Sequence, residues 1–277
     1  ETTLERMNLQ PLWDRYEKLL PPEPQAPDAP LQWRWSDIEP LVEGAARDVD
    51  MTKSERRVFM LTHPAFGGHP FATTNLFGGI QILGPGERAR LHRHSASAMR
   101  FILEPCDGGA STIVDGQHCE MLAGDLVLTP NWCWHEHHND GNKRCVWLDA
   151  LDLPLVASLG TIFAEHGALS AKRDQLWHVD DAAFRTAGLL PDVEAPRRPH
   201  SPMFRYPWAR TVEALQRAPE RADGSRRVRY VDPTTGEPAI VTLDCYAWQL
   251  ARGRATTTAR SSANAVFAVA EGEGSSR

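Results

Sequence analysis

The middle of the chain is a series of short apolar runs, and this series limits the folds available to it. Between residues 56 and 156 the runs are about four to eight residues long, are rich in Val, Ile, Leu and Phe, and end at Gly, Pro, Asn or Asp. Such runs at close spacing are typical of strands in a β-sandwich or barrel. The 21 prolines among 277 residues favour the same fold class, because prolines at this density interrupt long helices. The sequence therefore predicts an all-β body.

The regions outside this body have different sequence patterns. Residues 4–20 place apolar side chains at helical spacing, which predicts an N-terminal helix interrupted near Pro11. The proline-dense segment 21–34 is expected to be extended, and a second short helix should end at about residue 49. We predict four regions: 1–55, an arm of helices and extended chain; 56–156, the barrel; 157–225, a linker with strapping segments; and 226–277, part of a second β-domain.

The second domain is expected to be incomplete. Residues 238–277 return to a strand-like texture, and the sequence stops directly after a predicted strand and turn. A sheet that ended there would leave an unpaired edge and an exposed core, which proteins avoid. We therefore expect truncation or incomplete ordering of this C-terminal domain.

Composition excludes several classes of function. The net charge of −6 argues against a nucleic-acid partner, and no apolar run is long enough to span a bilayer. The charged, amphipathic N-terminus is unlike a secretory signal. The cysteines are odd in number and lack C-x-x-C spacing, which argues against a disulfide framework and a thiolate zinc site; they are Cys106, Cys119, Cys133, Cys145 and Cys245. We expect a cytoplasmic protein with no nucleic-acid or membrane partner.

Five of the 11 histidines fall in two tight clusters, which carry the strongest chemical signal in the sequence. His92 and His94 are two residues apart, so on a strand both imidazoles point to one face. His135, His137 and His138 follow after several strand and turn signals, which allows the chain to return beside the first pair. Three neutral imidazoles inside a barrel would form a facial metal site with open positions. The alternative is that two surface strands happen to carry histidines.

Two spacing patterns favour the metal site. They read Gly86-x5-His92-x-His94 and Gly124-x5-Pro130-x4-His135-x3-Asn139. Together they resemble the two signature motifs of the cupin superfamily, whose fold is a double-stranded β-helix barrel. The chain departs from these motifs twice: the usual carboxylate after the second histidine is missing, and Trp132 stands where the second motif usually has glycine. The resemblance then implies a three-histidine site.

A closer resemblance is carried by the residues around the histidines. The first motif continues to Arg100-Phe101-Ile102, the second reads P-x-W-x-W-H-x-H-x-N, and the nearby runs contain Arg56-Arg57, Gly79-Ile80-Gln81 and Asp149. This set is similar to the gentisate 1,2-dioxygenase family, whose relatives that open salicylate or 1-hydroxy-2-naphthoate share these features. Members are bicupins that are typically longer than this sequence. The second module here has no histidine in the segment from Gly253, so only the N-terminal barrel can hold metal in this way.

The family resemblance implies Fe(II) on His92, His94 and His135, although zinc or nickel suits the same ligands. It also implies a small aromatic hydroxy acid and O2 as substrates. Gentisate (2,5-dihydroxybenzoate) would open between the carboxyl- and hydroxyl-bearing carbons to give maleylpyruvate. A homotetramer or homodimer is expected.

An anionic substrate needs cationic partners in the pocket. Arg100, six residues after His94, would pair its guanidinium with the carboxylate, the alternative being a structural arginine. Only one of Arg56 and Arg57 is expected to point inward, and we assign Arg56 to the anion pocket.

Other residues are expected to line the same cavity. Gln81 and Gly79 share one strand face, the first as a hydrogen-bonding partner and the second leaving room for the ring, with ordinary core packing as the alternative. Phe77 would form an aromatic wall. His137 would move a proton near the bound phenol or support a ligand. Asp149 would orient His137 or Arg100, because a carboxylate in an apolar strand needs a partner.

Three classes of function compete at this point. The first is a ring-cleaving dioxygenase for gentisate, or for salicylate or 1-hydroxy-2-naphthoate. The second is a non-oxygenase cupin metalloenzyme, such as an isomerase or hydrolase. The third is a sensing cupin without catalysis, which the three intact histidines disfavour. Fold alone does not decide between them.

Overall fold

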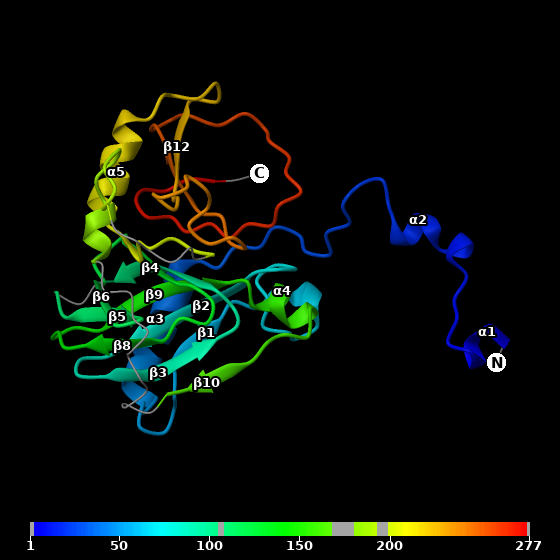
Figure 1. The fold of residues 1–277 in the computed structure, drawn as a ribbon, viewed down its shortest axis with the longest axis horizontal. Coiled ribbons are helices and arrows are strands. Elements are labelled where there is room, and N and C mark those ends of the chain that lie inside the picture. Colours follow the sequence, from blue (N-terminus) through cyan, green and yellow to red (C-terminus); the bar gives the residue numbers. More distant parts are fainter. Residues whose placement is uncertain (1–2, 105–107, 168–179, 193–198, 276–277) are drawn as a thin grey trace.

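The structure, a computed structural model, describes residues 3–104, 108–167, 180–192 and 199–275. Two antiparallel sheets form its body (Figure 1). The six-stranded sheet has the order β1 (Val58–Met60), β2 (Phe77–Leu83), β9 (Cys145–Leu151), β4 (Ala98–Glu104), β7 (Leu126–Thr129) and β11 (Arg205–Tyr206). The five-stranded sheet has the order β10 (Ala164–His166), β3 (Arg88–His94), β8 (His135–Asn139), β5 (Ala110–Val114) and β6 (Gln117–Glu120). The prediction of an all-β body is confirmed.

The two sheets share an apolar core. It joins Leu83, Ile102 and Trp147 of the six-stranded sheet to Val114 and Cys119 of the five-stranded sheet. These side chains are all buried, with at most 1% of their surface exposed. Because successive side chains on a strand point to opposite faces, the same strands also present a second set of residues outward.

The outward face of the six-stranded sheet is covered by α3 (Trp35–Asp48), close to the helix predicted to end at about residue 49. The side chains that pack with Val42 of this helix include Ile80, Ile82, Val146 and Leu148. Gln81 is paired with Trp147 across the β2 and β9 strands, so it shares the inward face with that tryptophan. Asp149, two residues further along β9, faces inward as well. The strand period thus delivers both candidate site residues to the barrel interior.

Several described elements that follow β9 lie outside the two sheets. They include α4 (Leu153–Ser158), η3 (Asp181–Phe184), α5 (Trp208–Arg217), β12 (Ser225–Arg229) and β13 (Tyr246–Leu250), while η2 (Pro64–Phe66) lies earlier, between β1 and β2. An apolar cluster joins Met99 and Leu128 of the barrel to Tyr206, Tyr230 and Leu243. Helix α5 was not predicted in the linker.

The region expected to be a second β-domain has little regular structure. Its strands β12 and β13 pair with each other, and residues 251–275, part of which we expected as a strand, contain none. The domain boundaries and the assignment of residues 226–277 to a second cupin stay predictions. The linker prediction includes residues 168–179 and 193–198, and these, like Cys106, lie outside the described residues.

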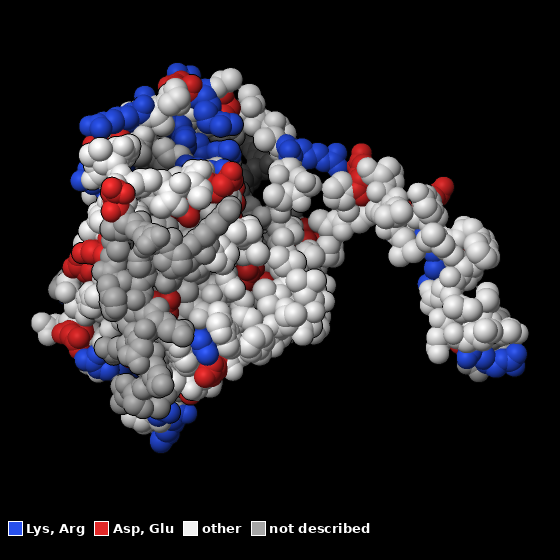
Figure 2. Space-filling view, viewed as in Figure 1, with Lys and Arg blue, Asp and Glu red and all other residues white. Residues whose placement is uncertain are grey.

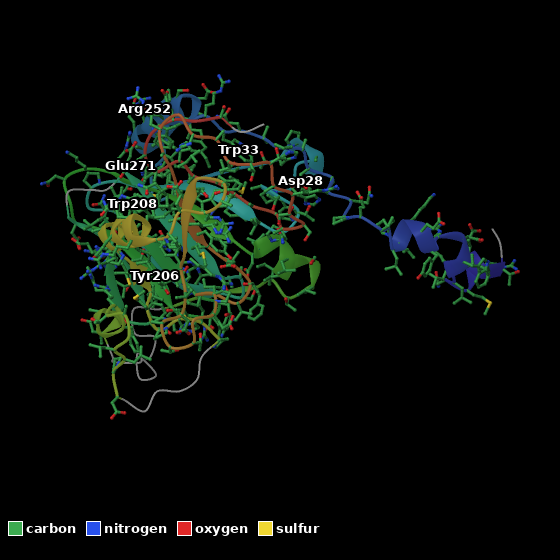
Figure 3. All side chains as sticks on the ribbon, turned by 90° about the horizontal axis from the view of Figure 1, so that it is seen from above. Asp28, Trp33, Tyr206, Trp208, Arg252 and Glu271 are labelled. Atoms are coloured by element: carbon green, nitrogen blue, oxygen red, sulfur yellow. The ribbon has the colours of Figure 1, made fainter. Side chains whose placement is uncertain are left out.

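The tail after β13 contacts distant parts of the chain. Trp208 Nε1 donates a hydrogen bond to Glu271 Oε1 at 3.2 Å, and both residues are labelled in Figure 3. Asn264 Nδ2 donates to Asn75 Oδ1 at 3.0 Å. Arginines gather over α5 and β12 (Figure 2), where Arg229 forms an ion pair with Asp244 at 2.8 Å that offsets part of this charge.

Residues 3–20 form an arm that projects away from the body (Figure 1). The arm contains α1 (Thr3–Arg6), η1 (Leu12–Asp14) and α2 (Tyr16–Leu19), so the predicted break near Pro11 separates short helical turns. None of these elements buries a residue. In the described part of the chain, no helix combines the length and the apolar character needed to cross a bilayer. Cys119, Cys133 and Cys145 are buried, and Cys245 is partly buried.

Candidate metal centre

Three histidines meet between the sheets, and they come from two neighbouring strands. His92 and His94 lie on β3, and His135 opens β8 and is directly opposite His92 in the β3–β8 register. One nitrogen from each ring lies within 4.8 Å of the others. The ring centroids are 4.0 Å apart for His92 and His135, and 4.8 Å apart for His94 and His135. The predicted convergence of the two histidine clusters is therefore present.

Local backbone geometry brings these rings together. Gly86 has a φ of +73°, in the left-handed region that favours glycine, and its turn leads into β3 as expected. A register shift between Ala89 and His92 inserts an extra residue into β3 relative to β8. This bulge directly precedes His92, and the carbonyl oxygen of Arg90 within it lies 3.0 Å from His92 Nδ1.

Each of the three rings is oriented by a backbone carbonyl. The Nδ1 atom of His94 donates to Ala96 O at 2.6 Å, and Nδ1 of His135 donates to Cys133 O at 3.0 Å. In His94 and His135 this pattern places the proton on Nδ1 and leaves the Nε2 lone pair available. In His92 the Nδ1 atom lies 3.0 Å from Arg90 O, and Arg56 Nη2 lies 2.8 Å from both ring nitrogens. Carbonyl partners of this kind are the usual way in which proteins fix the tautomer of a metal-binding histidine.

The three imidazoles are neutral. Burial, together with the positive charge of Arg56 and neighbouring groups, lowers the pKa of His92 to about 2. Burial lowers the pKa of His94 to about 4, and burial likewise holds the pKa of His135 well below its usual value. Neutral imidazoles are the form that binds metal.

The donor set fits a transition metal ion. Among the described residues, none donates a hydrogen bond to the fully buried Nε2 of His135, so that atom has an unused lone pair facing the cluster. Three imidazole nitrogens suit Fe(II), Zn or Ni, and three protein ligands leave positions for exogenous molecules. Before a metal ion could bind His92, the Arg56 side chain would have to move, because Arg56 Nη2 lies 2.8 Å from His92 Nε2.

The two candidate arginines, Arg56 and Arg57, have different partners. Arg56 contacts His92, whereas Arg57 forms an ion pair with Glu87 at 2.6 Å and donates a hydrogen bond to Val49 O at 2.9 Å. Burial and the nearby charge of Arg100 lower the pKa of Arg56 to about 10, so its guanidinium stays protonated at neutral pH. Arg56 is thus the member of the pair that faces the histidines.

Arg100 lies inside the barrel beside Asp149. Its Nε atom is 3.0 Å from Asp149 Oδ1, and its Nη1 donates to Thr129 Oγ1. Trp147 Nε1 also donates to Asp149, at 3.1 Å. Burial raises the pKa of Asp149, and the Arg100 and Arg56 guanidinium groups oppose that shift. The Arg100 and Arg56 guanidinium groups and the Asp149 carboxyl group therefore lie together beside the histidines.

His137 lies on the same face of β8 as His135. Its Nδ1 is 2.8 Å from Thr112 Oγ1, its ring packs on Trp147 at 5.2 Å, and burial holds its pKa well below the usual value. No described residue forms a hydrogen bond with its buried Nε2. Among the described residues, Asp149 forms no hydrogen bond with His137. Of its two expected partners, His137 and Arg100, Asp149 forms its ion pair with Arg100.

The remaining candidates lie on β2. Gln81 is 2% exposed, and its Nε2 has no hydrogen-bond partner among the described residues. At Gly79 an added Cβ would lie 2.9 Å from both the Phe77 ring and Val58 Cγ1. A side chain at position 79 would therefore collide with the Phe77 ring and with Val58, so glycine at this position allows the Phe77 ring to lie where it does.

Sequence reasoning missed a group on the opposite face of β3. Arg93 lies 4.3 Å from the ring centre of Trp132 and 4.5 Å from that of Trp134, and forms an ion pair with Glu165 of β10 at 2.6 Å. This arrangement attaches β10 to the metal strand. The two tryptophans close together before His135 were the available signal.

Trp132 also has an unusual backbone. Its φ is +63°, in the left-handed region, and its N–H donates to His94 O at 2.9 Å. The glycine usual at this motif position is therefore replaced by a tryptophan that keeps a glycine-like conformation. Such a residue persists only when its surroundings hold it there.

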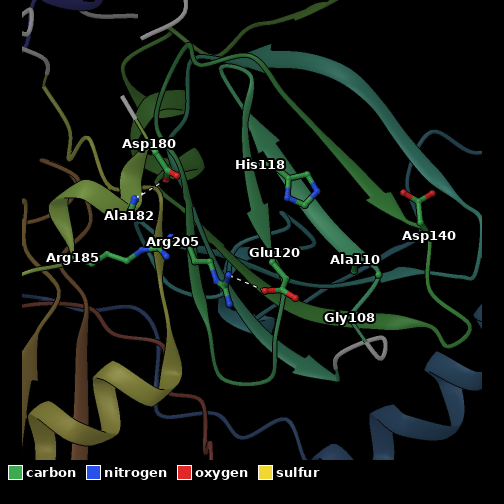
Figure 4. A pocket seen from close by; sticks show the side chains of 10 residues that line it. Gly108, Ala110, His118, Glu120, Asp140, Asp180, Ala182, Arg185 and Arg205 are labelled. Carbon is green, nitrogen blue, oxygen red and sulfur yellow. Dashed lines mark hydrogen bonds and ion pairs between the residues drawn. The ribbon is translucent and has the colours of Figure 1, made fainter. Parts of the chain in front are cut away.

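A cavity of about 470 Å³ lies elsewhere, at the β5–β6 end of the barrel (Figure 4). Its polar side chains serve structural contacts: Arg205 pairs with Glu120 at 3.1 Å, and Asp180 accepts from Ala182 N at 2.8 Å. None of the three clustered histidines lines it, so it is separate from the metal centre.

Comparison with known proteins places the chain in a family. The cupin domain model matches residues 79–151, which include all three histidines. Gentisate 1,2-dioxygenase 1 of Aquipseudomonas alcaligenes is 36% identical over 279 residues, covering 99% of this chain and 80% of that protein. A gentisate 1,2-dioxygenase of a Ralstonia species is 38% identical, covering 99% of this chain and 77% of its own. The chain belongs to the gentisate 1,2-dioxygenase family.

The solved structures agree with that assignment. Salicylate 1,2-dioxygenase from Pseudoaminobacter salicylatoxidans, determined as an adduct with gentisate, superposes with a TM-score of 0.77 at 32% identity. The match covers 88% of this chain and 69% of that chain. The predicted cupin fold and membership of the gentisate 1,2-dioxygenase family are both confirmed.

Proposed function

We propose that the protein is an Fe(II)-dependent ring-cleaving dioxygenase that opens gentisate with O2 to give maleylpyruvate. The observation that carries this proposal is the cluster of three neutral imidazoles next to Arg56 and Arg100 in a gentisate 1,2-dioxygenase family barrel. Both oxygen atoms of O2 enter the product, so the reaction needs no external reductant. The bond between the carboxyl- and hydroxyl-bearing ring carbons is the one that breaks.

His92, His94 and His135 would hold the metal, His94 and His135 through Nε2 because their Nδ1 atoms donate to backbone carbonyls. Ferrous iron bound there would supply a redox-active centre at which the aromatic acid and O2 can bind side by side. Arg56 must leave His92 Nε2 when metal binds, since its guanidinium lies 2.8 Å from that atom. This movement would make Arg56 available to the substrate carboxylate.

The other residues act on the substrate. Arg100 is held in place by Asp149 and Thr129, so it offers a fixed positive charge to the carboxylate. His137 is neutral, and its buried Nε2 has no hydrogen-bond partner among the described residues, so it would form a hydrogen bond with the ring hydroxyl and position its proton. Gln81 Nε2 would donate to a substrate oxygen, and Gly79 with Phe77 would shape the ring pocket.

Salicylate and 1-hydroxy-2-naphthoate are the alternative substrates. A family member of known structure is named for salicylate and was captured with gentisate, so both acids fit this kind of barrel.

The proposed assembly is a homodimer or homotetramer in the cytoplasm. The arm supports association, because Trp13 is 81% exposed and none of the arm elements buries a residue. The odd number of cysteines and the absence of C-x-x-C spacing support a reducing compartment.

Oxygen uptake tests the proposed reaction. The purified protein, reconstituted with Fe(II), should consume one O2 per gentisate and form a ring-opened product detected by ultraviolet absorbance. Salicylate, 1-hydroxy-2-naphthoate and 4-hydroxybenzoate, which lacks the ortho hydroxyl, complete the substrate panel. Zn(II) loading serves as the redox-inactive control. No oxygen uptake with any ortho-hydroxy acid would contradict the proposal and favour a non-oxygenase metalloenzyme.

A further inference from the structure

The turn after β3 controls the orientation of one metal ligand. His94 Nδ1 donates to Ala96 O at 2.6 Å, so the direction of the His94 lone pair depends on where that carbonyl lies. Ala96 and the next residue, Ser97, are 1% and 3% exposed. Whatever fixes this turn therefore also fixes the ring.

Asp152 fixes the turn by two backbone contacts. Ser97 N donates to Asp152 Oδ1 at 2.7 Å, and Asp152 N donates to Ser97 O at 3.3 Å. The Ser97 hydroxyl in turn accepts from Asn131 N at 3.2 Å, in the turn that leads to His135. Asp152, 2% exposed, is thus linked to the segments that carry two of the three histidines.

Asp152 stands where an ordinary helix-capping aspartate would stand, but it does not act as one. It is the N-cap residue of α4, and its side chain makes no capping hydrogen bond. Its second oxygen, Oδ2, accepts from Thr242 Oγ1 instead. Both carboxylate oxygens are therefore used to join distant segments.

Thr242 belongs to the C-terminal part of the chain, 90 residues after Asp152. The neighbouring Ile240 and Leu243 are 2% and 6% exposed and are packed with Met99 of β4. The threonine is thus anchored to the barrel on one side and reaches Asp152 on the other. A buried carboxylate that loses a hydrogen-bond donor is destabilised. Removal of the Thr242 hydroxyl should therefore make Asp152, and the turn at Ala96 and Ser97 that it binds, less well fixed.

We propose that Asp152 is a positioning residue through which Thr242, in the C-terminal segment, orients the metal ligand His94. This inference rests on the proposed metal site and adds to it. The C-terminal segment, which supplies no metal ligand, contributes to metal affinity through a chain of hydrogen bonds from Thr242 to Asp152, Ser97 and the Ala96 carbonyl.

Cobalt binding tests the inference. The metal-free full-length chain is titrated with Co²⁺ against a chromophoric chelator, and the visible spectrum of the bound ion is recorded. Asp152→Ala should weaken Co²⁺ binding roughly tenfold, at the low end for residues that support metal ligands. Thr242→Val, at an exposed position, should weaken it about threefold, as expected for one hydrogen bond. Both should change the cobalt spectrum, because the His94 ring is less well fixed.

Conservative variants and a control separate positioning from general damage. Thr242→Ser keeps the hydroxyl and should bind Co²⁺ within twofold of wild type, and Asp152→Asn, which keeps an acceptor for Ser97 N, should recover most of the loss in Asp152→Ala. Thr257→Val, in the exposed tail, should have no effect. If Asp152→Ala does not fold, Thr242→Val decides.

Two results would overturn the inference in distinguishable ways. Folded Asp152→Ala and Thr242→Val proteins with wild-type affinity and spectrum, even if their unfolding midpoints fall, would remove the positioning role alone. Absence of Co²⁺ binding by the wild-type chain would overturn the proposed metal site and this inference with it.

Discussion

Four histidines with lowered pKa values lie close together in this barrel. His92, His94, His135 and His137 all have pKa values held below the usual range by burial. An unfolded chain has no such burial, and its imidazoles titrate near pH 6.5. The metal site is therefore a source of pH-dependent stability.

The metal-free protein should lose stability as the pH falls below about 6.5. Between the folded pKa of about 4 for His94 and the unfolded value, the unfolded chain binds more protons, so the free energy of unfolding decreases on acidification. Each such histidine adds about 1.4 kcal/mol per pH unit to this slope. Urea denaturation at pH 7.5, 6.5 and 5.5 measures it. His94→Leu should have a shallower slope, and a flat profile in the wild type would contradict the assignment.

Arg100 is the residue whose removal should most affect substrate binding. Arg100→Ala should raise KM for carboxylated phenols by about tenfold or more, because a charge-assisted hydrogen bond is lost. The change also leaves Asp149 without its 3.0 Å partner, which lowers stability. The double variant Arg100→Ala with Asp149→Asn should restore the unfolding midpoint and leave KM high. Unchanged steady-state kinetics in Arg100→Ala would remove it from the anion site.

At the scale of elements, the β7–β8 turn shows what the motif requires. Trp132 keeps a φ of +63° at the position where the motif usually has glycine. Its ring compensates by packing on Arg93 at 4.3 Å and on Phe163 at 4.7 Å. The turn must adopt this conformation to lead into His135, and here side-chain packing replaces the freedom of glycine.

Two variants at this position should rank in an unusual order. Trp132→Gly and Trp132→Ala both lose the ring, but only glycine adopts the left-handed conformation without cost. The glycine variant should therefore be more stable than the alanine variant by about 1 kcal/mol. Chemical denaturation of the two proteins measures the difference. Equal stabilities, or a more stable alanine variant, would show that the turn relaxes to another conformation.

The strand period explains which parts of the site could be predicted. Residues two apart share a face, so His92 with His94 and Gln81 with Gly79 could be paired from the sequence. The β3 bulge and the contact of Arg56 with His92 could not, because they depend on how two strands meet in space. Helix α5 was missed because it follows a proline-rich stretch that resembles a linker. Asp152 was missed because nothing in its local sequence indicates a bond to a residue 90 positions away.

At the scale of the whole molecule, metal binding should stabilise the fold. A metal that binds only the folded chain adds about 2.7 kcal/mol at a free concentration one hundred times Kd. For a chain of this size we expect Tm to rise by several degrees. Thermal scans with and without Zn²⁺ measure the shift. His135→Ala should abolish it, whereas His69→Ala, on the η2–β2 loop, should keep it.

The central claim is that His92, His94 and His135 together hold one metal ion at the site of ring opening. Crystals of the protein grown anaerobically with Fe(II) and examined by anomalous scattering at the iron edge test it most directly. The account predicts a single strong peak about 2.0–2.2 Å from all three Nε2 atoms, the usual length of metal–imidazole bonds. A fully occupied iron peak at another place, with the three imidazoles unliganded, would contradict it.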